Sequence, residues 1–73
     1  MANDDGHDLH HEVFQILLEK VEQDPYPSVT MMDMIEEGLR PEDVQTYASV
    51  LLEKIRGDAF PSLDLIQRVR ALA

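Results

Sequence analysis

The sequence predicts an all-α, four-helix domain built from two tandem αα-hairpins that are related by an approximate twofold. Three observations predict it: apolar residues recur at three- and four-residue spacing, no segment alternates with period two over a useful length, and one helix–loop–helix pattern occurs twice. A chain of 73 residues has room for one small domain. We expect this domain to span residues 8–73, after a flexible acidic N-terminus at residues 1–7.

The internal repeat has an offset of 34 residues. Residues 17–29 read LLEKVEQDPYPSV, residues 51–63 read LLEKIRGDAFPSL, and seven of these 13 positions are identical. A weaker similarity continues on both sides, which places hairpin one at residues 8–38 and hairpin two at residues 40–73. One hairpin of this size buries too little apolar surface to be stable alone, so we expect the two hairpins to enclose one core.

Hairpin one is expected to contain helices over about residues 9–22 and from Ser28 or Thr30 to Gly38. Asp8 or Asp5 can cap the first helix, and the prolines of the following Asp-Pro-Tyr-Pro segment end it. Gly38 is placed as a left-handed residue that ends the second helix. The apolar face of the first helix comprises Val13, Phe14, Leu17, Leu18 and Val21, and it is widened by Leu9 and Ile16.

The first helix of hairpin two is expected to begin at Pro41, because proline favours the first position of a helix. Gly57 ends its first helix, and the last helix follows from Ser62 to near Leu72. Its apolar faces comprise Val44, Tyr47, Ala48, Leu51, Leu52 and Ile55, then Leu65, Ile66, Val69 and Leu72. The loop aromatics of the two hairpins, Tyr26 and Phe60, are expected to insert into the core.

Composition excludes several classes of protein. Without cysteine, the chain has neither a disulfide nor a thiolate metal site. No apolar run approaches the ~18 residues of a membrane span, and the acidic N-terminus does not resemble a signal peptide. The net charge of -9 argues against nucleic-acid binding. We therefore expect a cytoplasmic, globular domain that binds neither membranes nor nucleic acids.

The excess negative charge lies entirely in the first half of the chain. Residues 1–37 contain ten acids and one base, whereas residues 38–73 contain five of each. This asymmetry serves solubility or meets a basic partner. A protein that occupies the basic site of a nucleic-acid-binding protein is a third hypothesis, ranked last because the acids form no long regular row.

The 34-residue period of helix pairs is similar to that of tetratricopeptide repeats, but the glycine and packing alanines of that family are absent in register. Tandem helix–loop–helix units also resemble EF-hands. Each loop here offers one carboxylate and carries proline where ligands belong, which excludes calcium binding there. An acidic four-helix domain resembles an acyl carrier protein, but Ser28 and Ser62 lack the Asp-Ser-Leu context. No functional residue is carried over from these families.

The sequence offers no catalytic constellation: it lacks a glycine-rich phosphate loop, a cysteine nucleophile and a nucleophile elbow. We expect no enzymatic activity and no cofactor. All three histidines, His7, His10 and His11, lie within five positions of an acidic segment. A helix reaching back to residue 7 would make His7 and His11 neighbours able to chelate zinc, nickel or copper, so a metal- or pH-responsive accessory protein is the alternative function.

The main hypothesis is a small acidic protein–protein interaction or regulatory adaptor module that binds a protein partner or forms a homodimer. Three of the four methionines lie in the second helix of hairpin one, on more than one of its sides. Methionine adapts to varied partners, and a helix that is apolar on two sides must bury both. The predicted partner-binding residues are Met31, Met32, Met34, Glu36 and Glu37. The alternative for these methionines is a place in the core.

Overall fold

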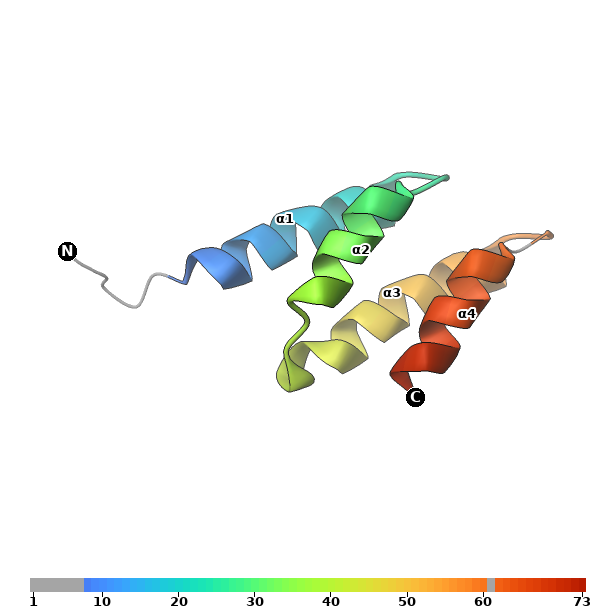
Figure 1. Ribbon diagram of the computed structural model, residues 1–73. Coiled ribbons are helices and arrows are strands. Elements are labelled where there is room, and N and C mark those ends of the chain that lie inside the picture. The colour runs from blue at the N-terminus through green and yellow to red at the C-terminus, as the bar shows by residue number, and fades with distance from the viewer. Residues whose placement is uncertain (1–7, 61) are drawn as a thin grey trace. The chain divides into compact units, whose positions relative to one another are not determined.

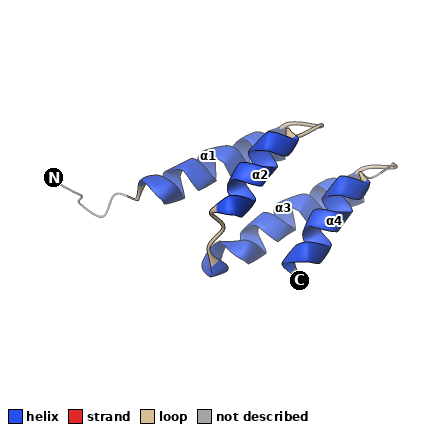
Figure 2. Cartoon of the chain, viewed as in Figure 1, coloured by secondary structure: helices blue, strands red, loops and turns tan. Residues whose placement is uncertain are grey.

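The computed structural model of the protein describes residues 8–60 and 62–73, which contain helices and loops but no strand (Figures 1 and 2). The elements are α1 (Leu9–Gln23), α2 (Val29–Glu37), the 3₁₀ helix η2 (Pro41–Asp43), α3 (Val44–Gly57) and α4 (Leu63–Leu72). The all-α prediction is confirmed for this part of the chain. The four α-helices lie within about three residues of their predicted bounds.

The chain divides into two compact units between Gly38 and Leu39. Within the first unit, which we call hairpin one, α1 packs against α2. Within the second, hairpin two, α3 packs against α4, and η2 leads directly into α3. Figure 1 shows each helix pair joined by a short loop at one end.

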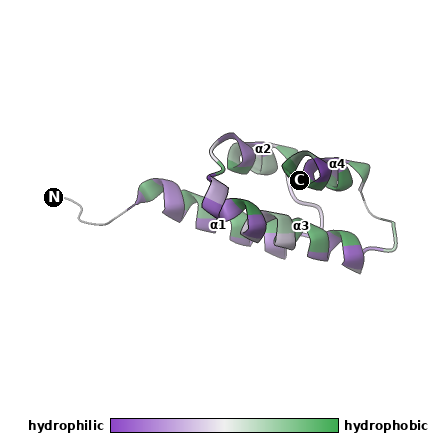
Figure 3. Cartoon of the chain, turned by 90° about the horizontal axis from the view of Figure 1, so that it is seen from below, coloured by the Kyte–Doolittle hydropathy of each residue, from purple (hydrophilic) through white to green (hydrophobic). Residues whose placement is uncertain are grey.

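Each helix is amphipathic, as Figure 3 shows by the alternation of polar and apolar residues around it. Side chains with less than one tenth of their surface exposed form the core. These are Phe14, Leu18, Val21, Met32 and Ile35 in hairpin one, and Tyr47, Leu51 and Leu65 in hairpin two. Burial of such side chains contributes roughly 1.5–3 kcal/mol each, which makes it the main stabilising term.

The two hairpins bury neighbouring positions of the repeated pattern rather than the same ones. Leu18 is buried, whereas Leu52 at the equivalent position is half-buried. The reverse holds one residue earlier, where Leu51 is buried and Leu17 is half-buried. The buried aromatic residue shifts in the same way. Tyr47 aligns with residue 13, one position before Phe14, and both aromatic side chains are buried. The most deeply buried positions therefore differ by one residue between α1 and α3, while the neighbouring positions stay half-buried in α3.

Both loops use an aspartate to bend the chain. In hairpin one, the backbone N–H of Tyr26 donates to Asp24 Oδ1 at 3.0 Å, and in hairpin two that of Phe60 donates to Asp58 Oδ1 at 3.0 Å. Such aspartate turns hold the backbone independently of any core contact. Tyr26 is 86% exposed and Phe60 89% exposed, so the expectation that they insert into the core is wrong. The turns carry both aromatic rings away from the helix pair.

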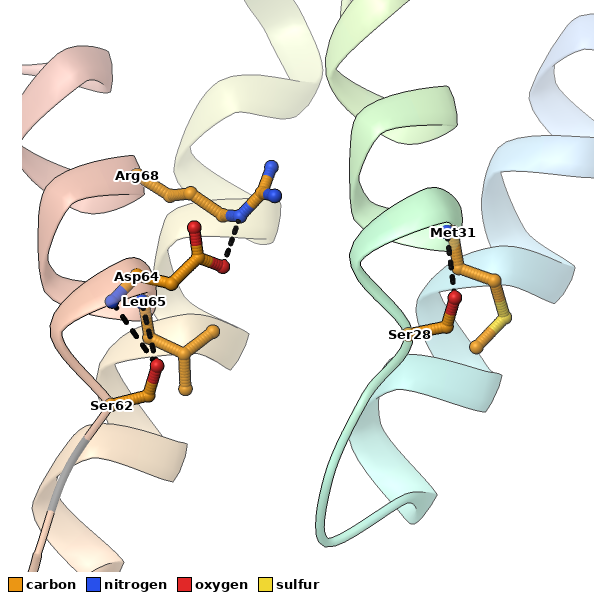
Figure 4. Close-up of polar contacts among 6 residues, drawn as sticks. All are labelled: Ser28, Met31, Ser62, Asp64, Leu65 and Arg68. Carbon is orange, nitrogen blue, oxygen red and sulfur yellow. Dashed lines mark hydrogen bonds and ion pairs between the residues drawn. The ribbon is translucent and has the colours of Figure 1, made fainter.

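Serine caps start α2 and α4 (Figure 4). Ser28 Oγ accepts a hydrogen bond from the backbone N–H of Met31 at 3.3 Å. Ser62 Oγ accepts two, from Asp64 at 3.1 Å and from Leu65 at 3.4 Å. Each serine satisfies amide groups that have no partner within the first helical turn.

The other helix termini follow the sequence with two differences. Asp8 caps α1 by accepting from the His11 backbone N–H at 3.3 Å, while Asp5 lies outside the described residues. Pro41 does begin a helical turn, but as the 3₁₀ helix that precedes α3. Gly38 has φ -109° and ψ 17°, so the expected left-handed conformation is wrong. Its N–H instead donates to the Glu36 carbonyl.

The caps give a first prediction. Ser28→Ala and Ser62→Ala should each lower the free energy of unfolding by about 1 kcal/mol, because each leaves helix-terminal N–H groups without their side-chain acceptor. Urea denaturation followed by circular dichroism measures this loss. Ser49→Ala is the control, since Ser49 is exposed within α3 and alanine favours helix there. A loss at Ser49 as large as that at the caps would contradict the assignment.

The one-residue shift in burial gives a second prediction. Leu51→Ala should cost about 2–5 kcal/mol and Leu17→Ala distinctly less, because Leu17 is only half-buried. At the next position the order should reverse, with Leu18→Ala costing more than Leu52→Ala. The four variants delete the same atoms, so urea denaturation compares burial alone. Equal losses at equivalent positions would mean that the two copies bury the same face.

Candidate functional site: an apolar groove on hairpin one

A groove of about 310 Å³ lies between α1 and α2 of hairpin one. Its buried floor is formed by Phe14 and Ile35. Val13 on α1 is 49% exposed and Met34 on α2 is 51% exposed, so both margins present apolar surface to solvent. The residues that line this α1–α2 groove are His10, Val13, Phe14, Leu17, Met34, Ile35, Glu37 and Gly38.

The apolar face of α1 is wider than hairpin one covers. Consecutive residues of a helix point ~100° apart, so viewed along its axis the apolar residues of α1 fill an arc of about 200°. Ile16 lies at one edge of this arc and Leu18 at the other. The buried residues Phe14, Leu18 and Val21 account for only about 60° of this arc. The uncovered part carries Leu9 at 67% exposure, Ile16 at 54% and Val13 at the groove margin. A helix buried on one face typically needs an apolar stripe of roughly 100°, so α1 has about twice that width.

Hairpin two provides an internal comparison for this surface. Tyr47 and Leu51 occupy the positions of the repeat that correspond to Val13 and Leu17, and both are 0% exposed. This edge of the helix is therefore fully buried in α3, whereas in α1 Val13 is exposed and Leu17 half-buried. Met34 on the other margin corresponds to Arg68, which forms an ion pair with Asp64 at 2.8 Å. Hairpin one thus has an apolar residue where hairpin two has a charged one.

One end of the groove is closed by a hydrogen bond between α1 and the end of α2. His10 Nε2 lies 2.7 Å from the Gly38 carbonyl oxygen, so this ring nitrogen carries the hydrogen and donates it. The contact leaves no space for a side chain at Gly38: a Cβ built there would lie 2.6 Å from His10 Cε1. A Cβ at residue 38 would therefore displace the exposed His10 ring, so this contact, and not the backbone angles, favours glycine there.

The same end of the groove is electrostatically negative. Glu37 lines it, and α2 has no basic residue in its last turn to offset the partial negative charge of its terminal carbonyl groups. Across residues 8–38 there are eight carboxylates and one lysine. An apolar floor beside a negative end favours a ligand that is both apolar and cationic.

The structure places the predicted partner-binding residues of α2 in different surroundings. Met34 and Glu37 line the groove. Met32 is 2% exposed and belongs to the core of hairpin one, while Met31 and Glu36 are half-buried. The three methionines therefore divide between core and surface, because consecutive residues on a helix point in directions ~100° apart.

The predicted histidine cluster is only partly within the described residues, because His7 lies outside them. His10 uses Nε2 to bond Gly38. The ring of His11 lies against Phe14, with centroids 6.5 Å apart and planes tilted by 35°. Over residues 8–60 and 62–73, no three histidine, aspartate or glutamate side chains are grouped closely enough to hold a metal ion.

The predicted partner-binding set contains two of the eight groove residues, Met34 and Glu37. Sequence reasoning assigned Val13 and Leu17 to the core and His10 to a metal site. The signal that identifies the apolar margin of α1 is the width of its apolar arc. The added residues Leu9 and Ile16 lie on the side of α1 away from Leu18, and hairpin one leaves both exposed. A stripe wider than one neighbouring helix can cover indicates a surface for a further contact.

The bond between His10 and Gly38 gives a third prediction. Gly38→Ala should displace the imidazole, so a subsequent His10→Ala should cost almost nothing, whereas His10→Ala alone should cost about 0.5–1.5 kcal/mol. Urea denaturation of the two single variants and the double variant measures this coupling. Gly57→Ala is the control, because a Cβ there meets nothing within 4 Å and alanine favours helix. Additive losses at residues 10 and 38 would show that the contact contributes no stability.

No protein-family model, curated protein or solved structure matches this chain. Within the described part of the chain, none of the helices combines the length and the apolar character that a bilayer crossing requires.

Proposed function

We propose that this chain is a small, acidic, non-catalytic protein-interaction module, or adaptor, that binds a protein partner through the α1–α2 groove. The observation that carries the proposal is the pair of apolar margins, with Val13 and Met34 each about half exposed on either side of an apolar floor. Contiguous exposed apolar surface that is rimmed by polar residues is typical of interaction sites.

The residue types in the groove support this proposal. Met34 is unbranched and polarisable, so it adapts its conformation to different surfaces. Leu9 and Ile16 extend the apolar margin along α1 beyond the groove. Binding a partner here would remove these side chains from water and gain roughly 25 cal/mol for each Å² of apolar surface buried.

The two loops support a partner-binding role independently of the groove. Tyr26 and Phe60 occupy equivalent positions of the repeat, and both are exposed. Aromatic residues that the core does not use are typical contributors to protein interfaces. We propose that the hairpins are copies of one unit, and that the exposed aromatic was retained in both.

A charge placed in the groove tests the proposal. Met34→Glu should reduce partner capture at least tenfold, because it puts a carboxylate on an apolar contact surface. Val29→Glu is the matched control: Val29 lies on the same helix, is 54% exposed, and does not line the groove. The measurement is capture from the source cell on immobilised chain, quantified by mass spectrometry and compared between the two variants.

Circular dichroism of both variants establishes that each is folded, and size-exclusion chromatography with light scattering measures their mass. A wild-type dimer that Met34→Glu dissociates would identify the partner as a second copy of the chain. Equal capture by the two folded variants would contradict the proposal that the groove is the binding surface.

A further inference from the structure

We infer that the α1–α2 groove binds a short amphipathic helix that presents apolar side chains to the groove and carries lysine or arginine along its margins. This inference rests on the proposed function and adds the chemical class of the partner. Three features of hairpin one carry it: the shape of the groove, its apolar floor and its charge.

The shape of the groove fits a helix. On α1 its lining residues are His10, Val13, Phe14 and Leu17, which follow the i, i+3, i+4, i+7 spacing of one helical face. These positions span two turns, or roughly 10 Å at 1.5 Å per residue. Two helices packed side by side leave a groove into which the side chains of a third helix fit, and amphipathic segments bind other proteins in this way. A partner of about three turns would cover the groove and the adjoining Leu9 and Ile16.

The apolar character of the groove sets the contact face of the partner. Phe14 and Ile35 are buried below it, and Val13 and Met34 are the margins that a partner would cover. The equivalent edge of α3, at Tyr47 and Leu51, is fully buried. Side chains at this position of a helix pair can therefore be completely buried, and a partner could bury the corresponding edge of α1. The partner must present apolar side chains at three- and four-residue spacing to achieve the same burial.

The charge of hairpin one selects a basic partner. Its described residues carry eight carboxylates and one lysine, and Glu37 lies in the groove beside the negative end of α2. A second copy of the chain would bring a net charge of -9 to this surface, which opposes self-association through it. Lysine or arginine beside the apolar face of the partner would be attracted over a distance of about one Debye length, ~8–10 Å at physiological salt.

The test uses three synthetic 18-residue peptides with the full-length chain. The first has leucine at i, i+3, i+4, i+7 and i+11 and lysine on its other face. The second has the same composition in scrambled order, and the third has glutamate in place of lysine. We expect the first to bind with micromolar Kd by calorimetry, at least tenfold tighter than either of the others, and to weaken as salt is added.

Two variants in the groove and one control outside it test whether the peptide binds there. Met34→Glu should weaken binding of the lysine peptide at least tenfold, although the added negative charge by itself would attract a cationic peptide. Val29→Glu adds the same charge outside the groove and should leave Kd within about twofold of the wild type or tighten it. Val13→Gln, which is uncharged and lies on the other margin, should also weaken binding. Chemical-shift changes on titration should include Val13, Leu17 and Met34.

Several outcomes overturn the inference. Equal binding of the patterned and scrambled peptides would show that only net charge drives the interaction. Equal binding by Met34→Glu and Val29→Glu would show that the peptide does not bind in the groove. Failure of all three peptides, with cellular partner capture still lost in Met34→Glu, refutes the basic amphipathic helix but leaves the proposed function intact. Dimerisation of the wild-type chain through the groove would replace the peptide with a second copy and also overturn it.

Discussion

An amphipathic helix whose apolar face is wider than its neighbour can cover must leave part of that face in water. This constraint governs hairpin one. Packing α1 against α2 buries Phe14, Leu18 and Val21, but the apolar arc continues past Val13 to Leu9 and Ile16. Within the described residues of hairpin one, α2 is the element that packs against α1, and it leaves them exposed. Its stability and its exposed surface therefore come from the same stripe, since the residues that hold the helices together are continuous with those that border the groove.

The loops and caps act on this packing by fixing where each helix starts. In both hairpins an aspartate turn is followed four residues later by a serine that caps the next helix, and these contacts fix where α2 and α4 begin. These hydrogen bonds are local, so they form whatever lies beyond the hairpin. They also direct Tyr26 and Phe60 to solvent, where an aromatic ring contributes little to folding and is available to a partner.

The repeat shows why similar sequences need not have similar surroundings. Leu17 and Leu51 are identical residues at equivalent positions, yet only Leu51 is fully buried. Burial depends on every side chain that reaches the same point, and these differ between the copies, as in the exchange of Phe14 with Ala48 and of Val13 with Tyr47. The consequence for function is that the open edge lies on α1 and its covered counterpart on α3.

The sequence by itself determined the helices, their caps and their order. These follow from local chemistry: the spacing of apolar residues, a serine or aspartate that caps α1, α2 and α4, and proline or glycine at the boundaries. It also indicated α2 as a surface to consider and hairpin one as the acidic half. Only the tertiary structure decided which methionine is core, that Tyr26 and Phe60 are exposed, and that His10 bonds Gly38. Those outcomes depend on contacts between residues far apart in the chain or on the direction a turn takes, and periodicity along one helix does not encode either.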